Sequence, residues 1–576
     1  MKNEKRLITA ALTYINNIPH VGHIVGCHLP ADIFARFCRS YGYDTTFVGG
    51  SDMHGTPSLI TAQEIGVPVE KLTSALHEVH AKIYKKLGIS YDIYSNTHTK
   101  VHEQITQDFF LKLYKNDYIA EGESEIFYCD NCQMFLPDRF VVGTCPKCGY
   151  ENASGDQCEK CDSLFSLNEL KDAKCKTCGH TAVLRKSKNI FIKLGKGTEE
   201  LDKYIESKKD VWRPHVYSEA KKWVKEGLKD RCISRDIKWG FPIPLKGYED
   251  KVFYVWFDAP IGYISITKEL SEQKYKDLWL DNSAKIYNFI GKDNIQFHTV
   301  FFPTMLIGEG EYNKAHNVVG LNFLNFEGQK FSKSKKIGVF CNAFLDDNAN
   351  VDIDTLRAYL TTIIPENKDT DYKWEEFKNN TNSELVGKFG NLFNRSLNMV
   401  KNYFGGILNY EFDEKDLNKT DLEVVSAIRE FPAKIADAFE KAELRDAYKL
   451  IMNYAVVGNG YLEKSAPWSL MKQERTKEAE KVLFLALNLC ASLCIVSSPI
   501  IPNKAQTLWS EQLGLSGNPS SNDFWQNASL LNIKKGHSIG NIFPVFERLD
   551  EARLDEIKQI LSQPFDIAEY FKKNNG

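Results

Sequence analysis

The sequence lacks the hallmarks of several protein classes. It contains no G-x-x-x-x-G-K-[ST] phosphate loop, because Lys196, Lys292 and Lys388 follow glycines but precede Gly, Asp and Phe. A P-loop ATPase is therefore excluded at the level of the motif. The charged residues 1–6 lead directly into an apolar, strand-like run and offer no apolar core of the kind that a secretory signal needs. No internal repeat or low-complexity tail is present.

An excess of charge of one sign is also absent. The chain has 73 Lys and Arg against 76 Asp and Glu, a formal net charge of -3, so there is no global attraction to nucleic acid and any RNA site must be a local patch. The longest apolar stretch, residues 482–501, contains Asn488 and three serines. It is predicted to be a buried helix and not a membrane span. We expect a cytoplasmic protein.

Cysteine is present, and its spacing is informative. Eight of the fourteen cysteines form four C-x-x-C pairs within 50 residues: Cys129 and Cys132, Cys145 and Cys148, Cys158 and Cys161, Cys175 and Cys178. Such clustering in a reducing compartment indicates metal, and two four-thiolate sets are typical of closed structural zinc sites. Nested and sequential pairings both fit the spacing, and an iron–sulfur cluster is the alternative. The six single cysteines are predicted to be core residues.

The 576 residues are enough for several domains. Residues 1–118 alternate strand-like and helix-like runs, residues 119–230 form an insertion with the cysteine pairs, and residues 231–320 resume the sheet with apolar runs at 252–257, 286–290 and 318–320. Residues 321–375 form a loop-bearing region, and residues 376–576 are predicted to form a helix bundle. The predicted fold is an α/β Rossmann-like, doubly wound parallel sheet with a zinc-binding connective insertion, followed by an all-α bundle.

Two distant segments have the chemistry to bind a triphosphate. Residues 19–23, Pro-His-Val-Gly-His, precede a helical stretch that runs from residue 24 to 39, so their imidazoles lie where a helix N-terminus offers N–H groups to phosphate. Residues 330–334, Lys-Phe-Ser-Lys-Ser, lie between Gly328 and Gly338 in a stretch suited to a closing loop. Together they resemble the HIGH and KMSKS signatures of class I aminoacyl-tRNA synthetases, with valine and phenylalanine at two apolar positions.

The resemblance narrows to the methionyl-tRNA synthetase family and covers nearly the whole chain. The matching segments are residues 11–14, 52–56, 234–236, 255–263 and 297–298. Another weaker similarity, residues 291–293, follows a strand-like run. The resemblance implies phosphate or ribose contacts from His20, Gly22, His23, Lys292, Asp293, Lys330, Ser332 and Lys333. It implies a catalytic role for His20, His23, Lys330 and Lys333, and for Arg235 opposite the adenylate or pyrophosphate.

A methionine pocket needs a carboxylate for the α-ammonium group, an apolar aromatic wall for the thioether and a polar contact near sulfur. By resemblance, Asp52 supplies the first. The wall consists of Leu12, Trp256, Pro260, Phe297 and Phe301, and the polar contact comes from Tyr263 with His298. About 110 residues separate the sheet halves, which leaves no room for the large editing insert of isoleucyl, valyl or leucyl relatives.

The family resemblance also implies the remaining partners. Its single-zinc members keep the inner two cysteine pairs, which implies a nested scheme with one or two structural zinc ions. Asn391, Arg395 and Trp468 resemble the family's readers of a CAU anticodon. The implied activity is a methionine–tRNA ligase that uses ATP with Mg²⁺ to form methionyl-adenylate and then charges initiator and elongator tRNA(Met). Relatives that dimerise use an appended C-terminal domain, so a monomer is expected.

Two other classes of protein share some of these features. A cysteinyl synthetase would hold its substrate thiolate on zinc, which conflicts with fully ligated cysteine sets and with the segment 256–263. A zinc-stabilised RNA-binding relative without activity would be expected to have damaged ATP motifs, whereas His20, His23, Lys330 and Lys333 are all present.

Overall fold

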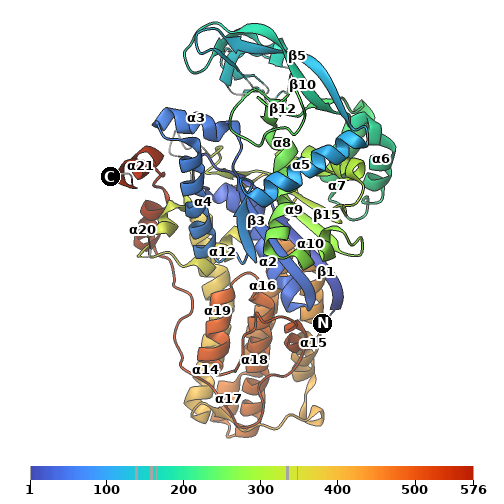
Figure 1. The fold of residues 1–576 in the computed structure, drawn as a ribbon. Helices are drawn as coiled ribbons and strands as arrows, with labels where there is room; N and C mark the ends of the chain where they lie inside the picture. The colour runs from blue at the N-terminus through green and yellow to red at the C-terminus, as the bar shows by residue number, and fades with distance from the viewer. Residues whose placement is uncertain are drawn as a thin grey trace.

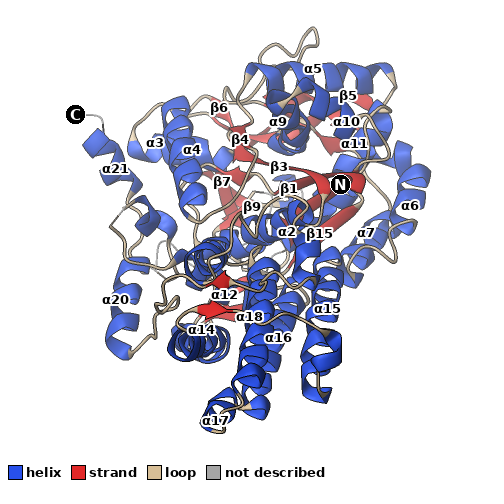
Figure 2. Ribbon diagram, turned by 90° about the horizontal axis from the view of Figure 1, so that it is seen from below, coloured by secondary structure: helices blue, strands red, loops and turns tan. Residues whose placement is uncertain are grey.

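A parallel sheet forms the centre of the molecule (Figure 2). The computed structural model describes residues 2–136, 140–155, 158, 160–161, 163, 165, 167–331, 337–346 and 348–574. The sheet has the order β15-β14-β1-β3-β2, with β4 also paired to β3. Its strands are β1 (Lys2–Ala10), β2 (Thr13–Tyr14), β3 (Tyr43–Asp52), β4 (Ile93–Asn96), β14 (Lys285–Gly291) and β15 (Asn317–Leu321). β1 lies inside the sheet, with β3 on one side and β14 on the other, so the strand order changes direction at β1. Sheets of this kind bind ligands at such a switch point.

Helices pack on both faces of this sheet (Figure 1). The stretch after the first histidine motif is not one regular helix: α1 (Val21–His23) continues into a π-helical turn (Ile24–His28) and then α2 (Leu29–Ser40). Pro30 explains the break, because it has no N–H to donate to the preceding turn and the backbone widens before it. The further helices of this half are α3 (Thr56–Ile65), α4 (Val69–Lys86) and α5 (Lys100–Lys115).

The cysteine-rich insertion contains more regular structure than its sequence suggests. β5 (Ile119–Cys129) pairs antiparallel with β10 (Val183–Ile192) along their whole length. The sequence of β5 does not show the usual alternation of apolar and polar residues, because charged residues alternate with small ones. Across the ladder, Glu123 faces Lys188 and Glu125 faces Lys186. The shorter strands are β6 (Met134–Phe135), β7 (Val141–Thr144), β8 (Ala153–Ser154) and β9 (Lys171–Cys175). The insertion also has a small core of its own, in which Phe127, Leu136 and Phe140 are buried.

After β10, the helices α6 (Thr198–Glu206) and α7 (Pro214–Glu226) complete the insertion, and β11 (Arg231–Cys232) follows. The predicted strand at residues 252–257 is wrong. Only β13 (Val252–Phe253) is a strand; it pairs with β12 (Ser234–Arg235) outside the central sheet, and α8 (Val255–Asp258) follows. Every residue of the run is apolar or aromatic, and such a segment carries no period that distinguishes strand from helix. Next come α9 (Gly262–Leu270), α10 (Glu272–Trp279) and α11 (Phe302–Glu309).

The second lysine segment lies between β16 (Leu324–Phe326) and α12 (Ile353–Thr362), and β17 (Thr370–Tyr372) pairs with β16. The bundle follows, with α13 (Trp374–Asn380), α14 (Asn391–Phe404), α15 (Lys419–Glu440), α16 (Leu444–Ser465), α17 (Pro467–Lys472), α18 (Thr476–Ser497) and α19 (Pro502–Thr507). α18 is the predicted apolar helix. Among the described residues it alone is long and apolar enough to cross a membrane, but 94% of its most apolar window is buried inside the protein, as expected of a core helix.

The last helices leave the bundle, which differs from the expectation of a bundle up to residue 576. After β19 (His537–Ser538), which pairs with β18 (Ile407–Leu408), the chain returns to the sheet end of the molecule, where α20 (Glu551–Leu561) and α21 (Ile567–Asn574) lie near α3 and α12 (Figure 1). The Phe340 N–H donates to the carbonyl of Leu561 at 2.8 Å. The C-terminal segment therefore packs beside the residues that follow the second lysine motif.

Candidate active site and metal centres

The first histidine motif forms a reciprocal helix cap at the carboxyl end of β1. Nδ1 of His20 accepts from the Gly22 N–H at 3.0 Å, and Nδ1 of His23 accepts from the His20 N–H at 3.1 Å. Both Nδ1 atoms are acceptors, so we assign the proton of each neutral ring to Nε2, which is then a donor. A Cβ atom on Gly22 would lie 2.7 Å from the His20 ring, so only glycine permits this arrangement.

The second motif reaches the first through its aromatic residue. The ring of Phe331 stacks on His20 with centroids 4.6 Å apart and planes within 4°. The segment after the motif is also tied to the first, because the Val21 N–H donates to the Val339 carbonyl at 3.0 Å and the Cys341 N–H to that of Pro19 at 3.4 Å. The fold thus brings the two distant segments together. Ser332 and Lys333 lie outside the described residues.

Asp369 connects the lysines predicted to contact phosphate. Nζ of Lys292 lies 2.6 Å from its Oδ1. Burial alone would raise the pKa of Asp369, but its bond to Lys292 and the nearby charge of Lys330 hold that pKa below its usual value. Asp293 lies beside the π-helical turn after the histidine motif, where burial and then the Asp293 charge raise the pKa of Cys27 to about 12. No signal in the sequence pointed to Asp369.

The aromatic residues of the predicted methionine pocket are brought together from separate elements. Trp256 of α8 stacks on Phe297 with centroids 3.7 Å apart, and Tyr14 meets Trp256 edge-on at 6.1 Å. Phe301 packs edge-on against Phe297 at 6.2 Å. Leu12 lies against Gly262, where a Cβ atom would be 2.7 Å from its side chain. The buried Pro260 lies between α8 and α9.

A buried polar pair borders these aromatics. The side chains of Tyr263 and His298 are hydrogen-bonded, with 2.9 Å between Oη and Nε2, and Nδ1 of His298 lies 3.0 Å from the Asn294 carbonyl. A carbonyl only accepts, so Nδ1 carries the proton and Nε2 accepts from the tyrosine hydroxyl. Burial lowers the pKa of His298 to about 4, so the imidazole is neutral at physiological pH.

Arg235 lies next to this region. Its guanidinium stacks over Tyr254 at 3.7 Å from the ring centroid, and Nη1 donates to the Ser234 carbonyl at 2.9 Å. Tyr254 directly precedes α8, so the arginine is held against the start of the helix that carries Trp256.

Asp52, at the end of β3, is almost completely buried, with 3% exposure. Oδ1 of Asp52 accepts from the His54 N–H at 3.3 Å. The His54 ring in turn binds Asp258, with 2.6 Å between Nδ1 and Oδ2. All three residues lie in segments that match the family, but the sequence indicates a role only for Asp52, because nothing in its spacing shows that residues 54 and 258 touch.

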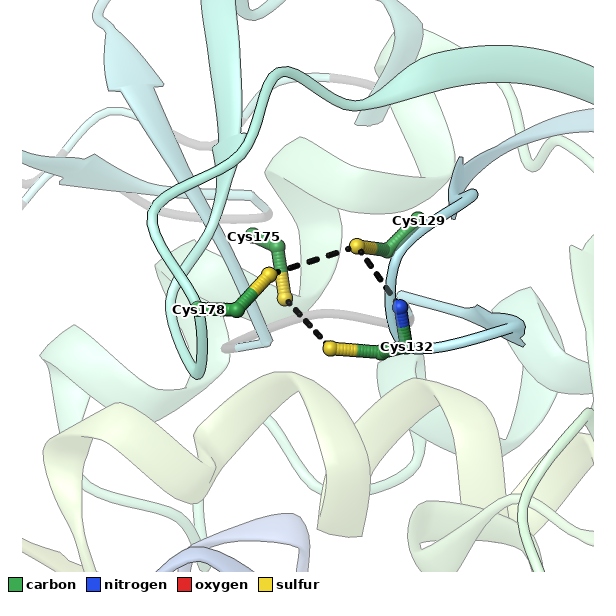
Figure 3. A group of neighbouring side chains, drawn as sticks. All are labelled: Cys129, Cys132, Cys175 and Cys178. Atoms are coloured by element: carbon green, nitrogen blue, oxygen red, sulfur yellow. Dashed lines mark hydrogen bonds between the residues drawn. The ribbon is translucent and has the colours of Figure 1, made fainter.

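The eight paired cysteines form two groups, each with its ligand atoms within 4.8 Å of one another. Figure 3 shows the outer group, Cys129, Cys132, Cys175 and Cys178; the inner group is Cys145, Cys148, Cys158 and Cys161. The grouping is therefore nested. Sulfur–sulfur distances of 3.5 Å and 3.9 Å in the outer group and 3.6 Å and 3.9 Å in the inner group agree with about 3.8 Å for a tetrahedron with Zn–S bonds of about 2.3 Å. The donor sets fit zinc.

The three predicted anticodon readers gather at the far end of the bundle. Nδ2 of Asn391 donates to Oδ1 of Asn459 at 3.0 Å, which joins α14 to α16. Arg395 lies over the Trp468 ring at 5.4 Å and pairs with Glu463 at 2.8 Å. Tyr461, the other aromatic near these residues, is 3% exposed and its hydroxyl donates to Asp421, so it belongs to the core.

Known proteins share this combination of parts. The family model for class I tRNA synthetases (M) matches residues 6–397, and the model for the anticodon binding domain of methionyl tRNA ligase matches residues 414–563. The methionine–tRNA ligase of Sulfolobus acidocaldarius is 40% identical over 96% of this chain and 98% of its own length. The cytoplasmic methionine–tRNA ligase of Caenorhabditis elegans is 40% identical over 96% of this chain, which spans 60% of that relative.

Solved structures show the same fold. The structure of Mycobacterium tuberculosis methionyl-tRNA synthetase in complex with methionyl-adenylate superposes with a TM-score of 0.78, at 22% identity, over 95% of this chain and 100% of that one. The parallel sheet, the two histidines after β1 and the lysine segment beside them define a class I tRNA synthetase. Within that class, the chain belongs to the methionyl-tRNA synthetase family.

Proposed function

We propose that the chain is a methionine–tRNA ligase, and the stacking of Phe331 on His20 is the observation that carries the proposal. In the first step the methionine carboxylate attacks the α-phosphorus of ATP and pyrophosphate leaves, so negative charge builds on phosphate oxygens. Nε2–H of His20 and of His23, together with Lys330 and Lys333, would stabilise that charge. Mg²⁺ enters as part of the ATP substrate. No covalent protein intermediate is required, because the catalysis rests on positioning and charge stabilisation.

The residues of the proposed methionine pocket have different roles in substrate recognition. Asp52 would bind the α-ammonium group, and the stacked Trp256 and Phe297 would line the path of the thioether. The neutral His298 accepts from the Tyr263 hydroxyl and fixes its orientation, and the Tyr263 oxygen would lie near the polarisable sulfur of methionine. Arg235, held by Tyr254, would contact the adenylate or the leaving pyrophosphate.

In the second step a hydroxyl of the terminal adenosine of the tRNA attacks the activated carbonyl and AMP leaves. The contact of Arg395 with Trp468 supports an anticodon site at the end of the bundle, since guanidinium planes and aromatic rings both stack on splayed bases. Asn391 would supply edge hydrogen bonds to a CAU anticodon in initiator and elongator tRNA(Met). The two cysteine groups would hold zinc and brace the insertion, with no open position for chemistry.

Exchange of pyrophosphate into ATP, measured with each standard amino acid in turn, tests the first step. Methionine alone should support exchange, and robust exchange with another amino acid, or none with any, would overturn the proposal. Charging of tRNA transcripts with a CAU anticodon and with a substituted anticodon tests the second step. Light scattering on the purified protein tests the expected monomer, which stays a prediction together with the cytoplasmic location.

A further inference from the structure

A buried hydrogen bond between His54 and Asp258 joins the two halves of the proposed methionine pocket. His54 follows Asp52 by two residues, and Asp258 follows Trp256 by two residues. The 2.6 Å bond from Nδ1 of His54 to Oδ2 of Asp258 therefore ties the segment that carries the carboxylate to the helix that carries the aromatic wall. These segments are 204 residues apart in the chain.

The surroundings make this bond strong. His54 is 3% exposed and Asp258 is fully buried. Phe241 and Trp239 meet the His54 ring edge-on, with centroids 4.6 Å and 5.4 Å away. An ion pair or charged hydrogen bond in such an apolar environment is poorly screened, so removal of one partner leaves a polar group uncompensated.

The other ring nitrogen of His54, Nε2, faces the exposed residue His98. Nε2 lies 2.8 Å from Nδ1 of His98, whose ring also packs on Phe241. His102 of α5 lies on the other side, with Nε2 at 3.9 Å from Oδ2 of Asp258. The titratable groups that face the pair are Asp52, His98 and His102. Tyr263 lies within reach of the charge of Asp52, Glu70 acts on His98, and Glu269 acts on His102.

Asp258 also acts on Asp52 through its charge. Burial would raise the pKa of Asp258, but His54 and His102 outweigh it and hold that pKa below its usual value, so Asp258 is an anion. Burial, and then the charge of Asp258, raise the pKa of Asp52 well above its usual value. Two carboxyl groups thus lie near one site, and a bound ammonium group would compensate their charge.

We propose that Asp258, held by His54, is a positioning residue for methionine: it fixes Asp52 relative to Trp256 and adds negative charge behind the site of the α-ammonium group. This inference rests on the proposed function, since it assigns a role within the same pocket. It concerns methionine binding and not ATP binding, because neither residue belongs to the histidine or lysine motifs.

The test compares four proteins in methionine-dependent pyrophosphate exchange between pH 5 and pH 8.5: the wild type, Asp258→Asn, His54→Gln and Asp354→Asn. Asp258→Asn keeps an oxygen that accepts from His54 but loses the charge. The KM for methionine should rise about tenfold, the effect of one charge-assisted hydrogen bond, while the KM for ATP stays within about twofold. His54→Gln should raise the KM for methionine in the same way.

The pH profile separates positioning by charge from a merely structural role. The acidic limb of kcat/KM for methionine reports the pKa of the free enzyme's essential carboxylate, here Asp52. Because Asp258 raises that pKa, its neutralisation should move the limb to lower pH in Asp258→Asn. Asp354→Asn removes another buried carboxyl, 2% exposed and outside the pocket, and should change neither quantity.

Four results would overturn the inference: an unmoved acidic limb in Asp258→Asn, an unchanged KM for methionine in both pocket variants, a parallel rise in the KM for ATP, or the same changes in Asp354→Asn. If Asp258→Asn does not fold, the ratio of the two KM values in His54→Gln decides. A wild type without methionine-dependent exchange would instead refute the proposed function, so the two failures are distinguishable.

Discussion

Arg357 should be the most costly single side chain to remove from the junction between the sheet and the bundle. It projects from α12, is 1% exposed, and its Nη2 lies 2.7 Å from Oδ2 of Asp32 in α2. The same guanidinium donates to carbonyls of Leu87, Pro499 and Ile500. One side chain therefore connects the helix after the histidine motif with the end of the long buried bundle helix.

The pKa of the Asp32 carboxylate indicates how much stability its buried charge contacts provide. Burial would raise the pKa of Asp32, but Arg36, Arg357 and Ser90 outweigh it and lower that pKa to about 2. Burial lowers the pKa of Arg357, which shows the cost of desolvating its charge. Arginine nevertheless stays protonated wherever the protein is folded, so only Asp32 titrates. A pKa lowered by about two units corresponds to about 2.5 kcal/mol. That stability is present above pH ~4, and is lost as the pH falls toward 2.

Substitution of Arg357 by methionine keeps the volume but leaves Asp32 with Arg36 and orphans three carbonyls. We expect a loss of about 3 kcal/mol in the free energy of unfolding at pH 7, the lower end for a broken buried pair. Urea unfolding followed by tryptophan fluorescence and circular dichroism measures it. Arg429→Met, which removes an exposed ion pair with Glu414, is the control and should cost less than about 1 kcal/mol.

A double-variant cycle completes the experiment. Asp32→Asn combined with Arg357→Met removes both charges, so it should cost less than the sum of the single variants by about 1–3 kcal/mol. The reasoning is refuted if Arg357→Met lies within about 1 kcal/mol of the wild type or if the cycle is additive.

Further predictions concern the metal sites, the anticodon end and the pocket. Cys132→Ser with Cys178→Ser should leave one zinc per chain by elemental analysis, because both belong to one nested group, whereas sequential pairing would lose both ions. Trp468→Ala should lower kcat/KM for aminoacylation by about 10–100-fold and spare pyrophosphate exchange, since a stacked base contributes ~1–3 kcal/mol; equal loss of both would mean a core role. His298→Asn should raise the KM for methionine by a factor that is constant from pH 5 to pH 8, because the pKa of His298, lowered by burial to about 4, keeps it neutral; a factor that varies with pH would contradict this.

Local patterns in the sequence were sufficient for a large part of this protein. The spacing of the histidines and the glycine at residues 20–23 is sufficient for the reciprocal helix cap. Both of its hydrogen bonds, from Gly22 N–H to His20 and from His20 N–H to His23, lie within one turn. The predicted runs at residues 286–290 and 318–320 are strands, because short β-branched and aromatic runs between turns fit a buried parallel sheet. Four identical cysteine spacings likewise predict metal sites with thiolate ligands without any knowledge of the fold.

Contacts between distant segments were decided only by the tertiary structure. The choice between nested and sequential cysteine groups depends on how β5 pairs with β10, which brings Cys129 to Cys178. Residues 255–258 are helical, and the uniformly apolar run 252–257 has no period from which helix could be told from strand. The bonds of Asp258 to His54 and of Asp369 to Lys292 join residues whose separation in the chain carries no signal. Sequence alone determined which chemical groups the protein has, and folding decided which of them meet, because a contact between remote residues depends on the packing of the whole chain.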